Sequence, residues 1–197
     1  MTTEAPPKTV DSKISDFLYR QIIFLNQESS YSKAALAKLR HAVGKPREET
    51  PDIWDITLLD APAGEQAGVA IHTALTLYAL HRQGKTECVS DGKTGFGTAI
   101  ASLSSKDQNN ESAIKRRFNA VSTASDFTEL AHHARGLVQL LKAKDIKLNY
   151  PRFASDLFFF QLPNHAGCIR LKWGEQFYRN FVKSDSDETK TEGTDEQ

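Results

Sequence analysis

Residues 113–142 carry the most regular hydrophobic pattern of the chain, and this pattern favours α-helices. Apolar residues of the first segment recur at intervals of four and three, which is the spacing of one helix face. They are Ile114, Phe118 and Val121. Three consecutive cations are turned away from that face: Lys115, Arg116 and Arg117. We therefore predict a helix with one side in a core and the other side cationic.

A second helix is predicted directly after a break at residues 122–125. Asp126 is a candidate N-cap, and Glu129 follows three residues later, as in a capping box. Apolar residues then follow the i, i+3, i+4 rule from Phe127 to Leu141. Arg135 and Lys142 belong to a separate polar stripe, so this helix too is expected to combine a core face with a basic flank.

Two further helices repeat the arrangement. The first is capped by Ser32 and ends near Gly44, and its outward cations, with those that follow it, include Lys38, Arg40, Lys45 and Arg47. The second covers residues 168–182 and carries Arg170 and Lys172 outside its apolar stripe. A solvated helix face or a helix-end salt bridge explains any one of these cations. Their recurrence on separate helices favours one surface for a polyanion.

The remaining segments also read as helices. Residues 11–25 are amphipathic, residues 66–83 are apolar on nearly all sides, and residues 51–59 form a short helix with Trp54 and Leu58 four apart. No long alternation of apolar and polar residues predicts a strand, so the fold class is all-α, with two small packed helical bundles. The predicted organisation is a disordered lead at residues 1–10, bundles at residues 11–105 and 106–183, and a disordered acidic tail at residues 184–197.

Charge is unevenly distributed although the formal net charge is zero. Residues 184–197 carry six acids and one lysine, whereas residues 113–183 carry twelve Lys and Arg against five Asp and Glu. The second half of the body is therefore the expected place for a polyanion. Cys88 and Cys168 form no CxxC pattern, and no stretch resembles a signal peptide or a membrane span. A cytoplasmic protein without a membrane partner is expected.

Patterns of catalysis are weak in this sequence. Gly92, Lys93 and Thr94 suggest a P-loop, but the glycine that a Walker A motif requires at position 87 is Glu87, so a surface loop is favoured. His132 and His133 are adjacent and point about 100° apart on a helix, so they cannot share one metal. His72 is interpreted as a core histidine. We expect neither an enzyme nor a cofactor or metal, and we favour a binding module.

The order of several segments resembles the CasB small subunit of the type I-E CRISPR Cascade complex. The resemblance runs over residues 33–182 and is carried by LRHAVGKP, IKRRFNAV, ELAHHARGLVQLLK and IRLKWGEQFYRNF. It implies two small helical bundles and a non-catalytic subunit of an RNA-guided antiviral surveillance complex. The implied partners are the backbone and large Cascade subunits, a second copy of the chain, crRNA and target DNA.

The same resemblance implies that the subunit stabilises guide RNA and target DNA, and above all the displaced non-target single strand of the R-loop. Positions that match the family's basic segments are then expected to contact phosphates. They are Lys38, Arg40, Lys45, Arg47, Lys115, Arg116, Arg117, Arg135, Lys142, Arg170 and Lys172. The alternative is a structural helical adaptor whose basic faces meet acidic proteins without touching nucleic acid.

Overall fold

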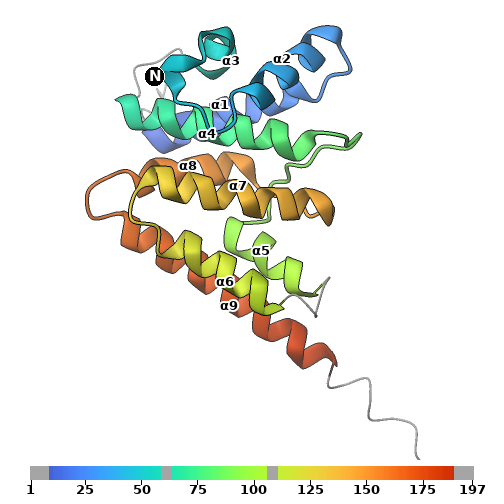
Figure 1. The fold of residues 1–197 in the computed structure, drawn as a ribbon, viewed down its shortest axis with the longest axis vertical. Helices are drawn as coiled ribbons and strands as arrows, with labels where there is room; N and C mark the ends of the chain where they lie inside the picture. The colour runs from blue at the N-terminus through green and yellow to red at the C-terminus, as the bar shows by residue number, and fades with distance from the viewer. Residues whose placement is uncertain (1–8, 59–63, 106–110, 189–197) are drawn as a thin grey trace, which may run out of the picture.

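The described part of the protein is a stack of helices (Figure 1). The structure is a computed structural model, and it describes residues 9–58, 64–105 and 111–188. The first helices are α1 (Val10–Leu25), α2 (Ser30–His41), α3 (Trp54–Thr57), α4 (Gly64–Arg82) and α5 (Phe96–Ser105). They are followed by α6 (Glu111–Ser122), α7 (Phe127–Ala143), α8 (Tyr150–Phe160) and α9 (Ala166–Glu188). Short 3-10 turns, η1 and η2, cover Arg47–Glu49 and Pro51–Ile53.

The all-α prediction is confirmed for these residues. They contain no strand, and the only extended pairing among them is an isolated bridge between Ser90 and Leu148. None of the described helices is long and apolar enough to cross a bilayer. α1 begins at Val10 and α9 continues to Glu188, so helical structure extends slightly beyond both predicted ends of the body. Residues 1–8 and 189–197, where the lead and most of the tail were predicted, lie outside the described residues.

Helix ends follow local side-chain chemistry. At α7 the Glu129 amide donates to the Asp126 carboxylate at 2.8 Å, which confirms the predicted cap. Glu129 in turn accepts from the backbone amide of Ser125 at 2.7 Å. The prediction of Ser32 as the cap of α2 was wrong. Ser29 has the extended backbone of a cap and its hydroxyl accepts from the Ser32 amide at 3.0 Å, while Ser32 itself is buried.

α4 is the centre of the upper layer, and α1, α2, α3, α7 and α8 all pack against it. Its buried residues lie on nearly every side, as the almost uniformly apolar sequence predicted. The short helix predicted before it, at residues 51–59, is present as η2 and α3. Ile53 and Ile56 are buried, whereas Trp54 and Leu58 are exposed.

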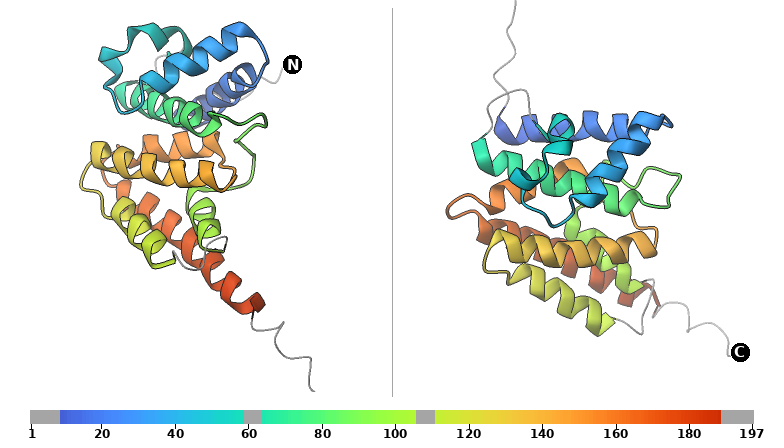
Figure 2. Two further views of the ribbon diagram at one scale, coloured as in Figure 1. Left: turned by 45° about the vertical axis from the view of Figure 1, so that its right-hand side comes forward. Right: turned by 45° about the horizontal axis from the view of Figure 1, so that its top comes forward.

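In both views of Figure 2, α7 and α8 lie between two groups of helices. One group is α1–α4, and the other is α5, α6 and α9. α8 packs against α1 and α4, although its sequence falls in the second predicted bundle. α5 packs chiefly against α9, although its sequence falls in the first. The contacts therefore cross the boundary between residues 105 and 106, and that boundary stays a prediction.

A close crossing joins α5 to α9. A Cβ atom added at Gly97 would lie only 2.1 Å from the Trp173 carbonyl oxygen. Beside it, the ring of Phe96 lies 4.7 Å from that of Trp173, measured between centroids. Phe118 of α6 stacks on Phe177 of α9 at 4.2 Å. Aromatic packing and one glycine thus fix α9 against the two helices that precede α7.

Candidate nucleic-acid interface

A groove of about 550 Å³ is lined by α4, by the first half of α7 and by residues 43–48, which follow α2. Its cationic side chains are Lys45, Arg47 and Arg135. The first two belong to the predicted surface on α2 and its following loop, and the third belongs to α7. The structure therefore brings together cations that are about ninety residues apart in the sequence.

Arg47 is held against α4 by a glycine. A Cβ atom at Gly68 would lie 2.3 Å from Nη1 of Arg47, so the guanidinium rests directly on the helix backbone. The carbonyl oxygen of Arg47 accepts from Trp54 Nε1 at 3.0 Å and from Thr50 Oγ1 at 2.9 Å. The side chain of Trp54 is exposed because its polar edge holds this loop.

Arg135 reaches the same loop from α7. Its Nη1 atom lies 3.2 Å from the position that a Cβ atom would occupy at Gly44. Gly44 has a φ of 80°, a conformation that side chains with a Cβ rarely adopt. This glycine turns the chain after α2 and also leaves space for the guanidinium of Arg135.

His72 lines the same groove and is 5% exposed. Its Nε2 atom is 3.2 Å from the Lys45 carbonyl oxygen, so Nε2 carries the proton and donates it. Burial, with a smaller effect from the charge of Arg47, lowers the pKa of His72, which is therefore neutral at pH 7. Nδ1 is then an acceptor, and it has no partner within the described part of the chain. The core histidine predicted from the sequence is confirmed as buried, but only one of its ring nitrogens is bonded.

The groove is not uniformly positive. Glu48 and Glu65 line it together with the three cations, and the exposed His132 adds a group that is charged only when protonated. A polyanion in the groove would therefore meet both signs of charge. Sequence reasoning did not include His132 or these two acids in the site, because only the folded chain brings them into the lining of one groove.

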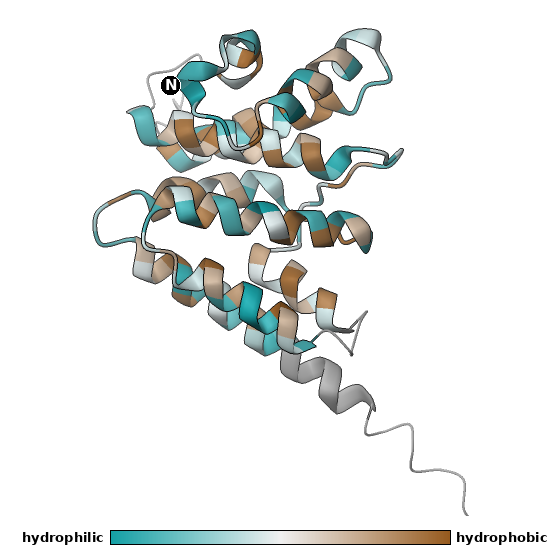
Figure 3. Cartoon of the chain, viewed as in Figure 1, coloured by the Kyte–Doolittle hydropathy of each residue, from teal (hydrophilic) through white to brown (hydrophobic). Residues whose placement is uncertain are grey.

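The outer face of α6 carries three consecutive cationic side chains. Lys115, Arg116 and Arg117 are all exposed, as the helix period predicted, and none of them forms an ion pair with another described residue. Lys115 Nζ lies 5.8 Å from the ring centroid of Tyr178 on α9, where the ring face attracts the ammonium group. The hydrophilic turns of α6 are visible in Figure 3. We call these three residues the α6 cationic turn.

Three other residues of the predicted site belong neither to the groove nor to the α6 cationic turn. Lys38 is exposed and Arg40 is half-buried on α2, and neither lines the groove. Lys142 donates to Gln83 Oε1 at 2.9 Å and so ties the end of α7 to the chain that follows α4. These positions are compatible with a broad basic surface but do not extend the groove.

The two predicted cations of α9 make intramolecular contacts. Arg170 donates to the Ala124 carbonyl oxygen at 2.5 Å, and its guanidinium carbon lies 5.2 Å from the ring centroid of Phe160. Lys172 pairs with Asp156 at 2.5 Å, and Trp173 Nε1 donates to the other oxygen of the same carboxylate at 2.7 Å. Both cations therefore fix α9 to the rest of the fold. Sequence reasoning did not identify Asp156, for which the only signal is a single acid in a largely apolar helix.

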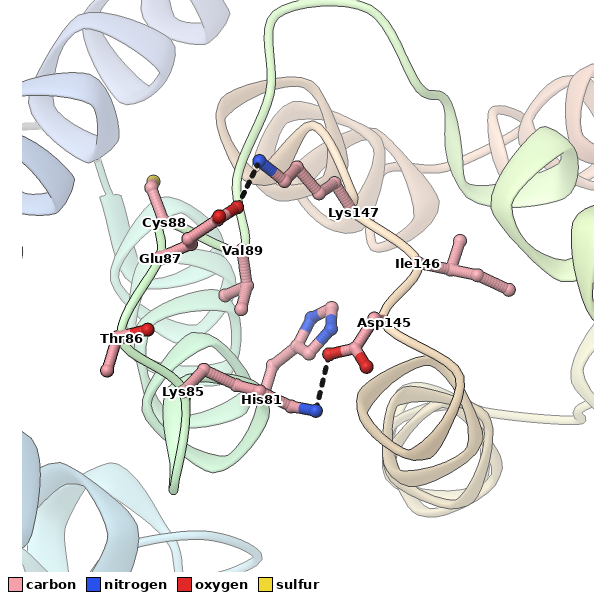
Figure 4. A pocket seen from close by; sticks show the side chains of 9 residues that line it. All are labelled: His81, Lys85, Thr86, Glu87, Cys88, Val89, Asp145, Ile146 and Lys147. Carbon is pink, nitrogen blue, oxygen red and sulfur yellow. Dashed lines mark hydrogen bonds and ion pairs between the residues drawn. The ribbon is translucent and has the colours of Figure 1, made fainter.

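A second cavity, of about 360 Å³, lies between the chain after α4 and the chain after α7 (Figure 4). Ion pairs between Lys85 and Asp145 and between Lys147 and Glu87 connect its two sides. At its base His81 is 1% exposed, and burial, helped by the charge of Lys85, lowers its pKa to about 4. His81 is therefore neutral at pH 7.

Cys88 also lines this cavity, but it does not form a catalytic pair with His81. In Figure 4 its sulfur points away from the imidazole. Sγ accepts from Asn26 Nδ2 at 3.0 Å and lies 3.4 Å from the Ser90 carbonyl oxygen, to which it donates. Among the residues that the structure describes, no group of three or more His, Cys, Asp or Glu side chains is arranged to hold a metal ion. The cavity thus lies between two loops that are joined by two ion pairs.

Comparison with known proteins places this geometry in a family. The chain is similar to the crystal structure of CasB from Thermobifida fusca, with 27% identity, a TM-score of 0.72, and coverage of 86% of this chain and 97% of that one. It is similar in fold to CasB from Thermus thermophilus, with 19% identity, a TM-score of 0.67, and coverage of 87% and 99%. A chain of a CRISPR RNA-guided surveillance complex matches with 15% identity, a TM-score of 0.74, and coverage of 91% and 99%.

The comparison with curated protein sequences gives no match. The family model of the CRISPR-associated protein Cse2 matches residues 35–178, which is most of the chain and includes the groove and the α6 cationic turn. The chain belongs to the CRISPR-associated protein Cse2 family.

Proposed function

We propose that this protein is a non-catalytic subunit of a type I-E CRISPR RNA-guided surveillance complex, Cascade, and that its basic surfaces hold nucleic-acid backbone. Membership of the Cse2 family supports the assignment, as does the similar fold of a chain in a surveillance complex. The implied partners are the backbone and large subunits, a second copy of the chain, crRNA and target DNA. The strand that depends most on this subunit is the displaced non-target strand of the R-loop.

The observation that carries the proposal is the α6 cationic turn, which presents three exposed cations without an ion pair among the described residues. Such a turn suits phosphate contacts, which are independent of sequence and weaken with salt. Replacing a DNA duplex by an RNA–DNA duplex is nearly balanced in free energy. A few phosphate contacts to the displaced strand can therefore decide whether the R-loop persists.

The groove adds a second contact region of a different kind. Its guanidinium groups are fixed on Gly68 and Gly44, so they lose little conformational freedom when they bind a phosphate. The acids Glu48 and Glu65 limit its total positive charge. We therefore assign most of the binding to the nucleic-acid backbone to the α6 cationic turn. Arg47 and Arg135 are assigned the role of positioning that backbone.

The test is binding of single-stranded DNA by fluorescence anisotropy over a salt series, in the assembled complex and with the isolated subunit. The variant carries Arg116→Glu and Arg117→Glu. The matched control carries Arg20→Glu and Lys93→Glu, which change the net charge equally at exposed positions outside the site. We expect the first variant to lower the slope of log Kd against log salt by about two, and the control to leave it close to wild type.

The outcome separates the proposal from the adaptor alternative. If both variants bind DNA like the wild type while the α6 variant no longer enters the complex, the basic face meets protein and the nucleic-acid assignment is wrong. If both variants lose affinity to the same extent, only net charge matters and the α6 cationic turn is not a site.

A further inference from the structure

An exposed aromatic ring lies beside the α6 cationic turn. Tyr178 on α9 is 43% exposed, and Nζ of Lys115 lies 5.8 Å from its ring centroid. α6 and α9 contact each other, and they lie side by side in Figures 1 and 2. Lys115 is the first residue of the cationic turn. This part of the surface therefore combines a flat apolar ring with positive charge.

Two buried rings hold the ring of Tyr178 in place. Phe118 and Phe177 stack on each other with their planes only 10° apart. The ring of Tyr178 is nearly perpendicular to both, at 85° to Phe118 and 87° to Phe177, with centroids 6.4 Å and 5.1 Å away. Edge-to-face contacts of this kind are favourable. The exposed ring is therefore preorganised, and it loses little conformational freedom when a flat ligand packs on it.

An unpaired nucleotide matches this pair of groups. Aromatic side chains stack on unpaired bases of any sequence, while neighbouring cations hold the phosphates. A nucleotide joins its base to its phosphate through one sugar, so Tyr178 and Lys115 are close enough to contact both ends of one nucleotide. The ammonium group is near the outer limit of a cation–π contact, about 6 Å, so it leaves the ring readily for a phosphate.

An acid on the same side of α9 favours a base over a phosphate at the ring. Glu175 is exposed and lies three residues before Tyr178, which places the two side chains on one helix face. Its carboxylate repels a phosphate but does not repel a neutral base. The arrangement therefore directs the base to α9 and the backbone to α6.

We propose that Tyr178 is a stacking platform for an unpaired base of a strand whose backbone lies on the α6 cationic turn. This inference rests on the proposed function and adds to it a preference for single strands. Phosphates are present in single strands and duplexes alike, whereas the base faces of a duplex are already stacked on one another. The ring therefore lets this surface distinguish the displaced strand of an R-loop from paired DNA.

Oligonucleotides with and without bases separate stacking from charge. Fluorescence anisotropy compares an oligo(dT) of about twenty nucleotides with an abasic strand of the same length, at ~50 mM salt, using the full chain and the assembled complex. Tyr178→Ala should weaken binding of oligo(dT) about five-fold to ten-fold, and binding of the abasic strand less than about two-fold. A duplex of the same length should also bind within about two-fold of wild type.

Two matched variants control for the ring and for the loss of any exposed tyrosine. Tyr178→Phe keeps the ring and should bind oligo(dT) within about two-fold of wild type. Tyr19→Ala removes a tyrosine that is 62% exposed on α1, away from α6, and should also leave the affinity close to wild type. If Tyr178→Ala weakens binding of the abasic strand as much as that of oligo(dT), the ring only supports the packing of α6 on α9 and the stacking role is wrong.

The remaining outcomes distinguish this inference from the proposed function. If wild type and Tyr178→Ala bind oligo(dT) equally and both affinities fall with salt, the stacking role is overturned and the proposed function stands. If neither the full chain nor the complex binds either strand, both proposals are contradicted. If Tyr178→Ala binds oligo(dT) normally but no longer enters the complex, the ring contacts a protein and the inference is wrong.

Discussion

Asp156 illustrates how one buried charge holds a helix in place. The carboxylate is 3% exposed and accepts from Lys172 and from Trp173 Nε1. We predict that Asp156→Ala lowers the free energy of unfolding by about 3 kcal/mol, because it leaves a partly buried ammonium and a buried indole N–H without an acceptor. Urea denaturation with an unchanged m-value measures the loss.

Lys172→Met is the comparison for this prediction. It removes the exposed partner but keeps the hydrogen bond from Trp173, so it should cost clearly less than Asp156→Ala. Equal losses would mean that the ion pair and not the buried indole bond dominates. The same contacts affect tests of function, since reversing Arg170 or Lys172 breaks packing as well as charge. A loss of DNA binding in such variants could not be assigned to a phosphate contact.

His81 gives the residue-scale prediction for pH. Its pKa is lowered to about 4 by burial, so the unfolded chain, with a histidine pKa near 6.5, takes up the proton first as pH falls. Stability from neutral His81 is fully present above about pH 6.5 and is lost as pH falls toward 4. Between pH 7.5 and pH 5 the wild type should lose about 2 kcal/mol more than His81→Gln, in urea denaturation at both pH values. Parallel losses in the two proteins would show that His81 does not titrate on unfolding.

At the scale of elements, two glycines in helices should respond oppositely to alanine. Gly97→Ala would place its Cβ atom 2.1 Å from the Trp173 carbonyl oxygen, so α5 and α9 must separate. We expect a loss of roughly 3 kcal/mol, measured by thermal or urea denaturation. Gly136→Ala in α7 meets nothing within 4 Å and should stabilise the protein by about 0.5–1 kcal/mol through helix propensity. If both substitutions destabilise the protein, the loss in Gly97→Ala cannot be assigned to the close packing of α5 on α9.

The sequence predicted helices well because their signals are local. The cap at Asp126, the core face of α1 and the burial of α4 all depend on residues within a few turns of one another. The prediction for α2 placed its cap three residues too late, because Ser29 and Ser32 are chemically equivalent and only backbone conformation distinguishes them. No hydrophobic pattern encodes the exposure of Trp54, whose indole N–H donates to the Arg47 carbonyl oxygen.

The candidate site could be predicted only in part for the same reason. Exposure of the α6 cationic turn follows from helix period alone. The groove requires knowing that α4 and α7 are neighbours, and that Gly68 and Gly44 leave room for two guanidinium groups. The bonded state of Arg170 depends on Ala124, which is 46 residues away. Contacts over such separations are fixed by tertiary packing, so a single sequence does not reveal which cations are available to a ligand.

At the scale of the whole molecule, the position of α8 in the sequence governs when the chain can fold during synthesis. α1 and α4 bury their apolar faces against α8, which ends at Phe160. During synthesis, a ribosome that has released only the first hundred residues has released helices without their packing partner. The amino-terminal layer must therefore wait, with exposed apolar surface, until nearly the entire protein has emerged. We therefore expect chaperones to bind the nascent chain mainly in this interval, before α8 can pack against α1 and α4.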